Sequence, residues 1–300
     1  MIKLSIRLFS PPSRHRTLTE WFATLPSLGW LTIFFLIPTL IIFAIVFKPA
    51  DPFGGVGSGW TMKNLNFSSF NYYEVIARTF WLSFFTTLIC LLLAIPIAYY
   101  MARLSEKWRN ILLMLIIVPF WTSFLVRIFA WKVLLHPEGV IKKVFVWTHL
   151  LSSDSTLLYT PGAVLLVMVY TYLPFAILPL YAAAEKFDFQ LIEAARDLGA
   201  HSFQAFYAIF LPGVKRGIIT AILMVLIPAL GSYVIPDLVG GPNGEMIGNK
   251  IAQRTFVDRN LPQASWLSAL LILVVLVPLI ITLFLQKRKS EKNILIEEGL

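Results

Sequence analysis

Six long stretches of this 300-residue chain carry almost no charge, and they limit what the chain can fold into more than any other feature. A helix needs roughly 20 residues to cross a hydrocarbon core of about 30 Å. Because a backbone in lipid must satisfy its own hydrogen bonds, we expect every stretch to be a helix. The sequence therefore predicts an all-α membrane protein with six transmembrane helices. The predicted spans are Leu28–Phe47, Phe80–Met101, Ile111–Ala130, Pro161–Ala184, Gly217–Pro236 and Trp266–Leu285.

The composition agrees with a chain that lies mostly in lipid. Hydrophobic residues make up 58% of the sequence and charged residues 14%, whereas a soluble domain carries about 25% charged residues. The formal net charge of +9 would suggest a nucleic-acid partner in a soluble protein. Here the division of Lys and Arg between the loops accounts for the excess, so no nucleic-acid partner is predicted.

The predicted loops on the two sides of the membrane differ in positive charge. The segments on the side of the termini, 1–24, 103–110, 185–216 and 286–300, hold 15 Lys and Arg residues, and the segments on the opposite side hold 9. Because Lys and Arg favour cytoplasmic loops, we expect both termini in the cytoplasm. The chain then divides into a cytoplasmic segment 1–27, a membrane domain 28–285 and a cytoplasmic tail 286–300.

Each predicted span contains at least one proline. A proline inside a helix removes a backbone hydrogen bond and kinks the helix, which suits a protein that opens and closes a cavity. Proline is also ordinary in membrane helices, so both interpretations stay open. The prolines concerned are Pro38, Pro96, Pro119, Pro174, Pro179, Pro228, Pro236 and Pro278.

The sequence shows no constellation that would carry catalysis. It contains no His-Glu-x-x-His pair, no Gly-x-Ser-x-Gly elbow and no phosphate-binding loop, and its one cysteine, Cys90, lies inside a span. The predicted spans also lack the mid-membrane carboxylates of carriers driven by protons or sodium. We therefore predict no catalytic residue, no metal site and no cofactor. Any energy for uphill transport would come through another polypeptide.

The longest predicted cytoplasmic loop, 185–216, has its own pattern. Phe187, Leu191, Ala194 or Ala195, and Leu198 recur at helical spacing and predict an amphipathic helix from about Asp188 to Leu198. Gly199 follows where a helix ends on a left-handed residue. Leu211-Pro212 then sets the entry into the fifth span, because a residue before proline is disfavoured in the α region. This pattern alone also fits an ordinary interfacial helix.

The same loop resembles the "EAA" motif of permease subunits in bacterial ABC importers that depend on a binding protein. The pattern Glu-Ala-Ala-x₃-Gly-x₉-Ile-x-Leu-Pro matches at all seven fixed positions and lies before the fifth span. The resemblance implies a type I ABC importer fold and a coupling helix that docks on a cytoplasmic ATPase. It assigns docking to Glu193, Ala194, Ala195 and Gly199, and support of the docking helix to Ile209, Leu211 and Pro212.

Two further stretches resemble the spermidine/putrescine branch of these permeases. They are 118–127, with Val-Pro-Phe-Trp-Thr-Ser-Phe-Leu-Val-Arg, and 227–242, which is followed by Met-Ile-Gly-Asn at 246–249. The resemblance covers about residues 80–285 and departs at Leu261, where tryptophan is expected. It implies that the chain carries polyamines across a bacterial inner membrane. A permease for another small solute is the alternative within the class, and a stand-alone carrier or a membrane enzyme lies outside it.

A polyamine cation needs carboxylates or aromatic faces along its path. The candidates are Trp121, Tyr233, Asp237 and Glu245. Each also has an ordinary reading: packing or an aromatic belt for the two rings, and solvated loop charges for the two acids. Arg127 would repel a cation, so we assign it to lipid headgroups or to helix pairing.

The resemblance also implies partners. They are a second, similar permease, two copies of the ATPase and a periplasmic polyamine-binding protein, which would meet the outer loops, mainly 237–265. Membrane lipid surrounds the assembly.

Overall fold

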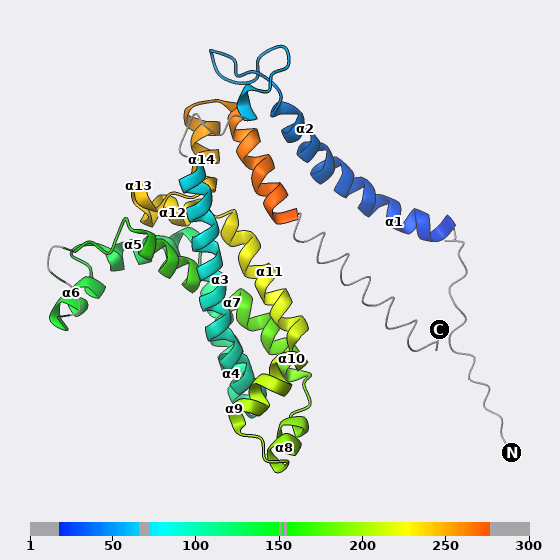
Figure 1. Ribbon diagram of the computed structural model, residues 1–300, viewed down its shortest axis with the longest axis vertical. Helices are drawn as coiled ribbons and strands as arrows, with labels where there is room; N and C mark the ends of the chain where they lie inside the picture. Colours follow the sequence, from blue (N-terminus) through cyan, green and yellow to red (C-terminus); the bar gives the residue numbers. More distant parts are fainter. Residues whose placement is uncertain (1–17, 66–71, 150–151, 153–154, 277–300) are drawn as a thin grey trace.

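The computed structural model describes residues 18–65, 72–149, 152 and 155–276. These residues form helices joined by loops, with one isolated bridge between Ala50 and Val56. The molecule is elongated, with α8 (Gln190–Asp197) at one end and the loop before α3 (Tyr72–Arg103) at the other (Figure 1). Residues 1–17 of the predicted N-terminal segment and the whole predicted tail lie outside the described residues. The all-helical prediction is confirmed for the described chain.

The centre of the fold is a bundle of α3, α7 (Pro161–Glu185) and α11 (Lys215–Leu230), which pack against one another. Each helix presents a buried ridge of residues four apart, and on α3 and α11 this ridge is made of small or short side chains. Without a hydrophobic drive between helices in lipid, such ridges let backbones approach closely. The ridges are Thr86, Cys90, Ala94 and Ala98 on α3, Val164, Met168, Tyr172, Ala176, Leu180 and Ala184 on α7, and Gly217, Ala221, Val225 and Ala229 on α11.

α7 and α11 approach each other closely at Gly217. A Cβ atom on this glycine would lie 2.5 Å from Cβ of Ala183 and 3.0 Å from the carbonyl oxygen of Pro179. The chain therefore needs a residue without a side chain here. α7 itself runs for 25 residues through Pro174 and Pro179, and α3 runs for 32 residues through Pro96. These prolines do not interrupt their helices.

Three described helices are long and apolar enough to cross a membrane, and they correspond to predicted spans one, two and four. The first is Thr24–Ile45, made of α1 (Leu18–Leu31), the π-turn η1 (Thr32–Leu36) and α2 (Ile37–Ile45). It leans away from the bundle in Figure 1, and no side chain in its most apolar window is buried. Its length agrees with the prediction, and near its end Phe43 of α2 packs against a small cluster that includes Val46, Tyr72 and Trp266.

The third predicted span, Ile111–Ala130, is wrong as a single helix. α4 (Glu106–Ile117) continues into a 3₁₀ turn, η4 (Val118–Trp121), and the chain then turns by 93° into α5 (Phe124–Leu135) and α6 (Val140–Trp147). Pro119 starts the tight turn, and Thr122 leaves the helical region with ψ 151°. The Thr122 hydroxyl donates to the Pro119 carbonyl at 2.7 Å, so this carbonyl at the helix break still has a hydrogen-bond partner.

The fifth predicted span, Gly217–Pro236, is also interrupted. α11 ends at Leu230, and a new helix, α12 (Val234–Val239), begins after Tyr233. Pro236 occupies the first turn of α12, where its missing N–H costs nothing because the first four N–H groups of a helix have no partner within it. The proline thus sits at the start of a helix rather than in its interior.

The end of the fold away from α8 consists of short helices and one longer helix that overlaps the sixth predicted span. α13 (Gly241–Gly244), α14 (Ile247–Ala252) and the π-turn η6 (Gln253–Val257) follow α12, and the 3₁₀ turn η2 (Lys63–Leu65) closes the loop before α3. A helix runs over Leu261–Leu276, five residues earlier than the predicted start at Trp266. The rest of that predicted span lies outside the described residues.

Candidate coupling loop and transport pathway

α8 forms where the loop pattern predicts a helix, and it ends as predicted. It covers Gln190–Asp197, and the Asp188 carboxylate accepts from the Gln190 N–H at 3.0 Å just before it. Gly199 has φ +92°, the left-handed region that favours glycine. Its N–H donates to the Arg196 carbonyl at 2.9 Å, and the next N–H, of Ala200, donates to the Ala195 carbonyl at 3.0 Å. This pair of bonds is a Schellman ending.

The apolar face of α8 differs from the prediction. The side that packs on the protein carries Phe189, Ile192 and Ala195, and Ile192 is 5% exposed. Leu191 and Leu198, which belong to the predicted apolar stripe, do not pack on the protein and are 52% and 90% exposed. The sequence contains two apolar stripes on this short helix, and period alone does not show which of them faces the protein. The exposed stripe leaves α8 with an apolar surface that could take a partner.

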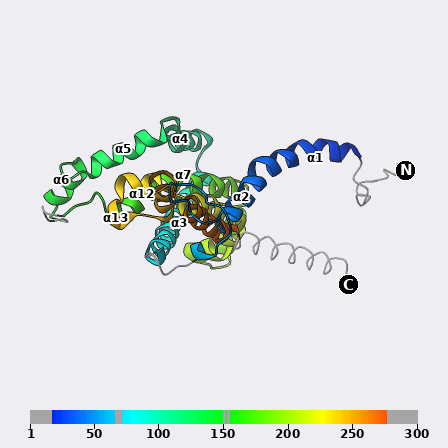
Figure 2. The ribbon, with the colours of Figure 1, turned by 90° about the horizontal axis from the view of Figure 1, so that it is seen from above.

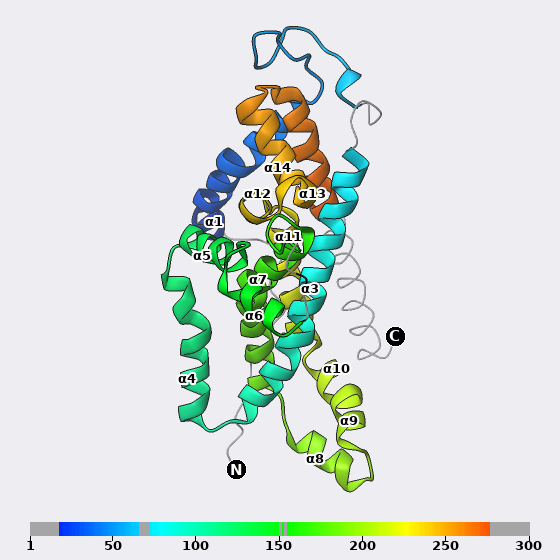
Figure 3. The same cartoon turned by 90° about the vertical axis from the view of Figure 1, so that its left-hand side faces the viewer.

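The motif residues divide between the two sides of α8. Glu193, Ala194 and Gly199 are exposed, and Ala195 is half-buried against the core. Glu193 and Gly199 also border a hollow at the tip of the loop, together with Arg196, Asp197 and His201. The structure therefore presents the part of the motif assigned to docking at the extreme end of the molecule (Figure 3).

The second half of the motif holds the loop against the bundle. After α9 (Ser202–Ala205), a π-turn, η5 (Phe206–Phe210), leads into α10 (Leu211–Gly213). Ile209 and Leu211 are half-buried and pack on the core, while Pro212 is exposed. Of the three residues to which the resemblance assigns support, Ile209 and Leu211 pack on the core and Pro212 does not.

The chain does not turn where Leu211-Pro212 predicts. Leu211 has φ −57° and ψ −46°, within the α region, and the helix axis bends by 71° only at Val214. The wider π-turn just before Pro212 is the physical reason, because it relieves the clash between a proline ring and the carbonyl one turn earlier.

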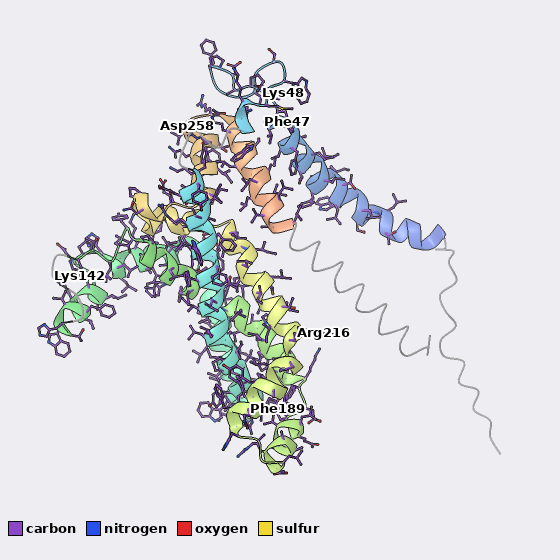
Figure 4. All side chains as sticks on the ribbon, viewed as in Figure 1. Phe47, Lys48, Lys142, Phe189, Arg216 and Asp258 are labelled. Carbon is purple, nitrogen blue, oxygen red and sulfur yellow. The ribbon has the colours of Figure 1, made fainter. Side chains whose placement is uncertain are left out.

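An aromatic cluster attaches the loop to α3, and sequence reasoning missed it. Tyr99 of α3 lies 5.8 Å from the ring of Phe189, 5.2 Å from Phe206 and 4.9 Å from Phe210, all near-perpendicular or steeply tilted. Phe187 lies 5.4 Å from both Phe189 and Phe210. Edge-to-face pairs at such distances are favourable beyond their buried area. The five rings form one contact network, and Figure 4 marks Phe189 at this end of the molecule.

Two residues beside the aromatic cluster fix its position. Arg103 donates from Nη1 to the Tyr99 hydroxyl at 2.9 Å, and its guanidinium lies 5.7 Å from the Phe189 ring. A Cβ atom on Gly213 would collide with the ring of Phe187, so this glycine admits the cluster beneath α10. The spacing of Phe203, Phe206 and Phe210 at helical intervals was the available sequence signal.

An ion pair joins the start of α4 to the end of α7, directly before the loop. Arg109 Nη1 lies 3.3 Å from Glu185 Oε1, and the Tyr181 hydroxyl donates to the same oxygen at 2.8 Å. The loop thus leaves a helix end that is tied to its neighbour.

The four pathway candidates lie at the breaks in spans three and five and beyond them. Trp121 ends η4 and is 79% exposed, and Tyr233 precedes α12 and is 49% exposed. α5 packs against α12, so the two breaks belong to one region. Asp237 is exposed on α12. No side chain of these four hydrogen-bonds or ion-pairs with another of the four.

The two acids differ in their surroundings. Glu245 Oε2 lies 2.6 Å from Nζ of Lys250, so this carboxylate is already neutralised by a neighbour. Among the described residues, no cation lies within ion-pair distance of Asp237. Asp237 therefore has charge left for an incoming cation, whereas Glu245 would first have to exchange its partner.

Hydrogen bonds hold the segment from Tyr233 to Asn249 on α3. Asn249 donates from Nδ2 to the Tyr233 carbonyl at 2.9 Å and accepts from the Met246 N–H at 3.0 Å. The Thr79 hydroxyl of α3 accepts from the Ile247 N–H at 2.8 Å. Asn249 and Thr79 are buried, and neither was singled out from the sequence as a site residue. The part of the chain that the structure describes contains no group of three His, Cys, Asp or Glu side chains placed to hold a metal.

Comparison with known families assigns the chain. Residues 94–292 match the family described as binding-protein-dependent transport system inner membrane component. This chain belongs to that family. The match includes the whole of α7, the coupling loop and α11. The chain is thus a transport permease subunit and not an enzyme, as its lack of catalytic motifs predicts.

Individual relatives and a solved structure agree. The chain is 39% identical over 263 residues to the spermidine/putrescine transport system permease protein PotB of Haemophilus influenzae, covering 87% of this chain and 91% of the relative. It is 37% identical over 235 residues to PotB of Escherichia coli, covering 78% and 86%. A bacterial ABC transporter that imports the acidic polysaccharide alginate has a chain of similar fold, with TM-score 0.71, 19% identity and coverage of 90% and 96%. The expected ABC importer permease fold is confirmed.

Proposed function

We propose that this chain is the permease subunit of an ATP-driven importer that carries polyamines such as spermidine and putrescine across a bacterial inner membrane. The observation that carries the proposal is the 39% identity to a permease named for spermidine and putrescine over 87% of the chain. The unpaired Asp237 supports it, because a polyamine is a cation. The chain would contain six spans with both termini in the cytoplasm.

The coupling loop would dock on a cytoplasmic ATPase through α8. Glu193 and Ala194 are exposed there beside Leu191 and Leu198, while Ala195 faces the core. Apolar side chains on the tip of a loop are the ordinary material of a protein interface. The importer would contain two ATPase copies, one for this loop and one for the loop of a second, similar permease.

Force would pass from the ATPase to the spans through the aromatic cluster. ATP closes the ATPase dimer, α8 moves with it, and the rings around Tyr99 transmit the displacement to α3. Gly217 lets α11 lie close to α7, so the bundle can respond as a packed unit rather than as separate helices. The result would be exchange between inward-open and outward-open states.

The substrate would pass near the broken ends of spans three and five. Trp121 and Tyr233 offer ring faces to ammonium groups, and Asp237 offers a carboxylate. α11 ends at Leu230 with its carbonyl end toward this region, and the partial negative charge of a helix C-terminus also favours a cation. A periplasmic polyamine-binding protein would deliver the substrate to the outer segments 237–265.

Uptake measurements test this function. Cells without their own polyamine importers would express the ATPase, second permease and binding protein encoded with this chain, with or without the chain itself. We expect uptake of labelled putrescine or spermidine that needs both this chain and ATP. If the complex assembles and hydrolyses ATP but imports neither compound, the importer class stands and the polyamine substrate is wrong.

A further inference from the structure

α5 and α6 together form an arm, residues 124–147, that extends sideways from the bundle. The arm is turned by 93° from α4, and Figures 1 and 2 show it running away from α3 and α7. α6 forms its far end and has few neighbours in the described chain. The end of the arm contains none of the residues of the coupling loop and none of the pathway candidates.

The arm lies level with one end of a membrane-crossing helix. Lys132 Nζ of α5 is 5.9 Å from the ring of Tyr159, and Tyr159 stands just before α7. α7 is apolar and has 25 residues, which at 1.5 Å per residue is about 37 Å and enough to cross the hydrocarbon core. Its other end leads into the coupling loop. The arm therefore lies at the membrane boundary opposite the coupling loop and runs across the bundle direction.

α6 has the surface of a helix that lies in such a boundary. Val140, Val144 and Trp147 recur at i, i+4 and i+7 and are 64%, 52% and 81% exposed. Lys143 lies beside this apolar face, and Lys142, marked in Figure 4, lies on the opposite side of the helix. Interfacial helices combine an apolar face with Trp and Lys side chains that reach the headgroups.

The arm is also positively charged. It carries Arg127, Lys132, Lys142 and Lys143 against a single carboxylate, Glu138. Arg127 lies 5.0 Å from the Phe120 ring, and Lys132 lies near Tyr159. Lys142 and Lys143 have no ion-pair partner among the described residues. Lys143 beside the exposed apolar face and Lys142 on the far side of the helix are two unpaired cations, which fit the phosphates of anionic lipids around an interfacial helix.

We propose that α6 lies in the headgroup layer of the leaflet opposite the coupling loop and binds anionic phospholipid headgroups through Lys142 and Lys143. Val140, Val144 and Trp147 enter the acyl boundary. A second permease subunit is the competing occupant of this face. Lysine is depleted in the cores of protein interfaces, which favours lipid.

Site-directed fluorescence tests the position of α6. Cys90 is 0% exposed, so the unmodified full-length chain serves as the labelling blank. A bimane label on Val144→Cys, in vesicles of phosphatidylglycerol and phosphatidylcholine and with any subunits that co-purify, should be quenched by brominated lipid and not by iodide. Met62→Cys, at a 75% exposed position in the loop before α3, is the aqueous control and should show the reverse.

The outcomes at position 144 are distinct. Quenching by brominated lipid supports the proposal. Quenching by iodide places the face in water, and protection from both quenchers shows that a protein covers it. Either of the last two results overturns the proposal and leaves the transport function untouched.

The choice of lipid tests the two lysines. Brominated phosphatidylglycerol should quench the label at position 144 more strongly than brominated phosphatidylcholine. Removing charge with Lys142→Gln and Lys143→Gln should lower this preference about fivefold per lysine. Lys63→Gln, at an exposed position in the loop before α3, should leave it unchanged. If the two brominated lipids quench the label equally while both lysines are present, the proposal that the lysines bind anionic headgroups is overturned.

Discussion

The two ends of this permease are held together by different kinds of contact. At the coupling end, the rings of Phe189, Phe206 and Phe210 lie 4.9 to 5.8 Å from the ring of Tyr99 on α3. Phe187 packs on Phe189 and Phe210 at 5.4 Å. At the other end, the segment from Tyr233 to Asn249 is held by polar contacts. Arg78 of α3 donates to the Glu245 carbonyl, Thr79 accepts from the Ile247 N–H, and Asn249 donates to the Tyr233 carbonyl.

This difference fits two different tasks. Packed rings resist relative displacement, because a close-packed interior transmits strain. Hydrogen bonds and the Glu245–Lys250 ion pair can be exchanged for other polar partners at little net cost. We therefore expect the coupling end to move as one body and the outer end to rearrange around a substrate.

The largest expected effect is at the exposed tip of the coupling end. Glu193→Lys and Gly199→Asp should lower ATPase co-purification more than about tenfold and abolish uptake, because they alter the surface that docks. Membrane abundance should not change. Gly55→Asp is the matched control: Gly55 has φ +100° and Gly199 φ +92°, and neither has an atom within 4 Å of a Cβ position.

The control separates strain from docking. An L-residue at either glycine costs about 1–2 kcal/mol of backbone strain, so stability should fall equally in both variants. Normal ATPase co-purification from Glu193→Lys and Gly199→Asp would remove the docking assignment.

The second prediction concerns the aromatic cluster. Tyr99→Ala removes the ring on which three phenylalanines pack, and it should destabilise the protein by about 3–5 kcal/mol. The adjacent Tyr100, 69% exposed, provides Tyr100→Ala as the control with a small effect. Thermal unfolding in detergent, together with the ratio of ATP hydrolysed to polyamine imported, gives the measurement. Equal unfolding temperatures for the two variants would mean that the cluster does not hold the loop.

The third prediction compares the two outer acids. Asp237→Asn should raise the half-saturating polyamine concentration about tenfold, because one unscreened charge contact is worth about 1.4 kcal/mol or more. Glu245→Gln should change it less than about twofold, since Lys250 already neutralises that carboxylate. Uptake over a range of polyamine concentrations distinguishes them. Identical curves for both variants and the parent protein would take these acids out of the pathway.

The smallest expected effect on transport is at Thr79. Thr79→Val removes the acceptor of the buried Ile247 N–H and should destabilise the outer end by about 1–3 kcal/mol. Thr39→Val is the control, because the Thr39 hydroxyl bonds only to the Phe35 carbonyl of its own helix. Hydrogen exchange of residues 246–249 should rise in the first variant only. Unchanged exchange there would show that Thr79 does not fasten this segment.

Features that depend on local chemistry could be predicted from the sequence. The helix of the coupling loop follows from apolar spacing, and its ending follows from Gly199, which is at φ +92°. Spans two and four follow from length and hydropathy, because α3 and α7 are continuous helices.

Features that are decided by competition between alternative packings could not be predicted from the sequence. Leu191 and Ile192 are adjacent apolar residues, and only packing decides that Ile192 is the buried one. Proline content did not locate the breaks, since α7 runs through two prolines while the turn after Pro119 also needs the extended Thr122. The aromatic cluster joins Tyr99 to residues about 90 or more positions later, a distance over which no periodicity carries information.

The most direct test of this account is ATP hydrolysis by the complete importer in proteoliposomes, with and without polyamine-loaded binding protein. Loaded binding protein should stimulate hydrolysis in the parent complex and in Gly55→Asp, and Gly199→Asp should abolish the stimulation. Stimulation that survives in Gly199→Asp, or that is the same with empty binding protein, would contradict a permease that couples polyamine import to an ATPase through α8.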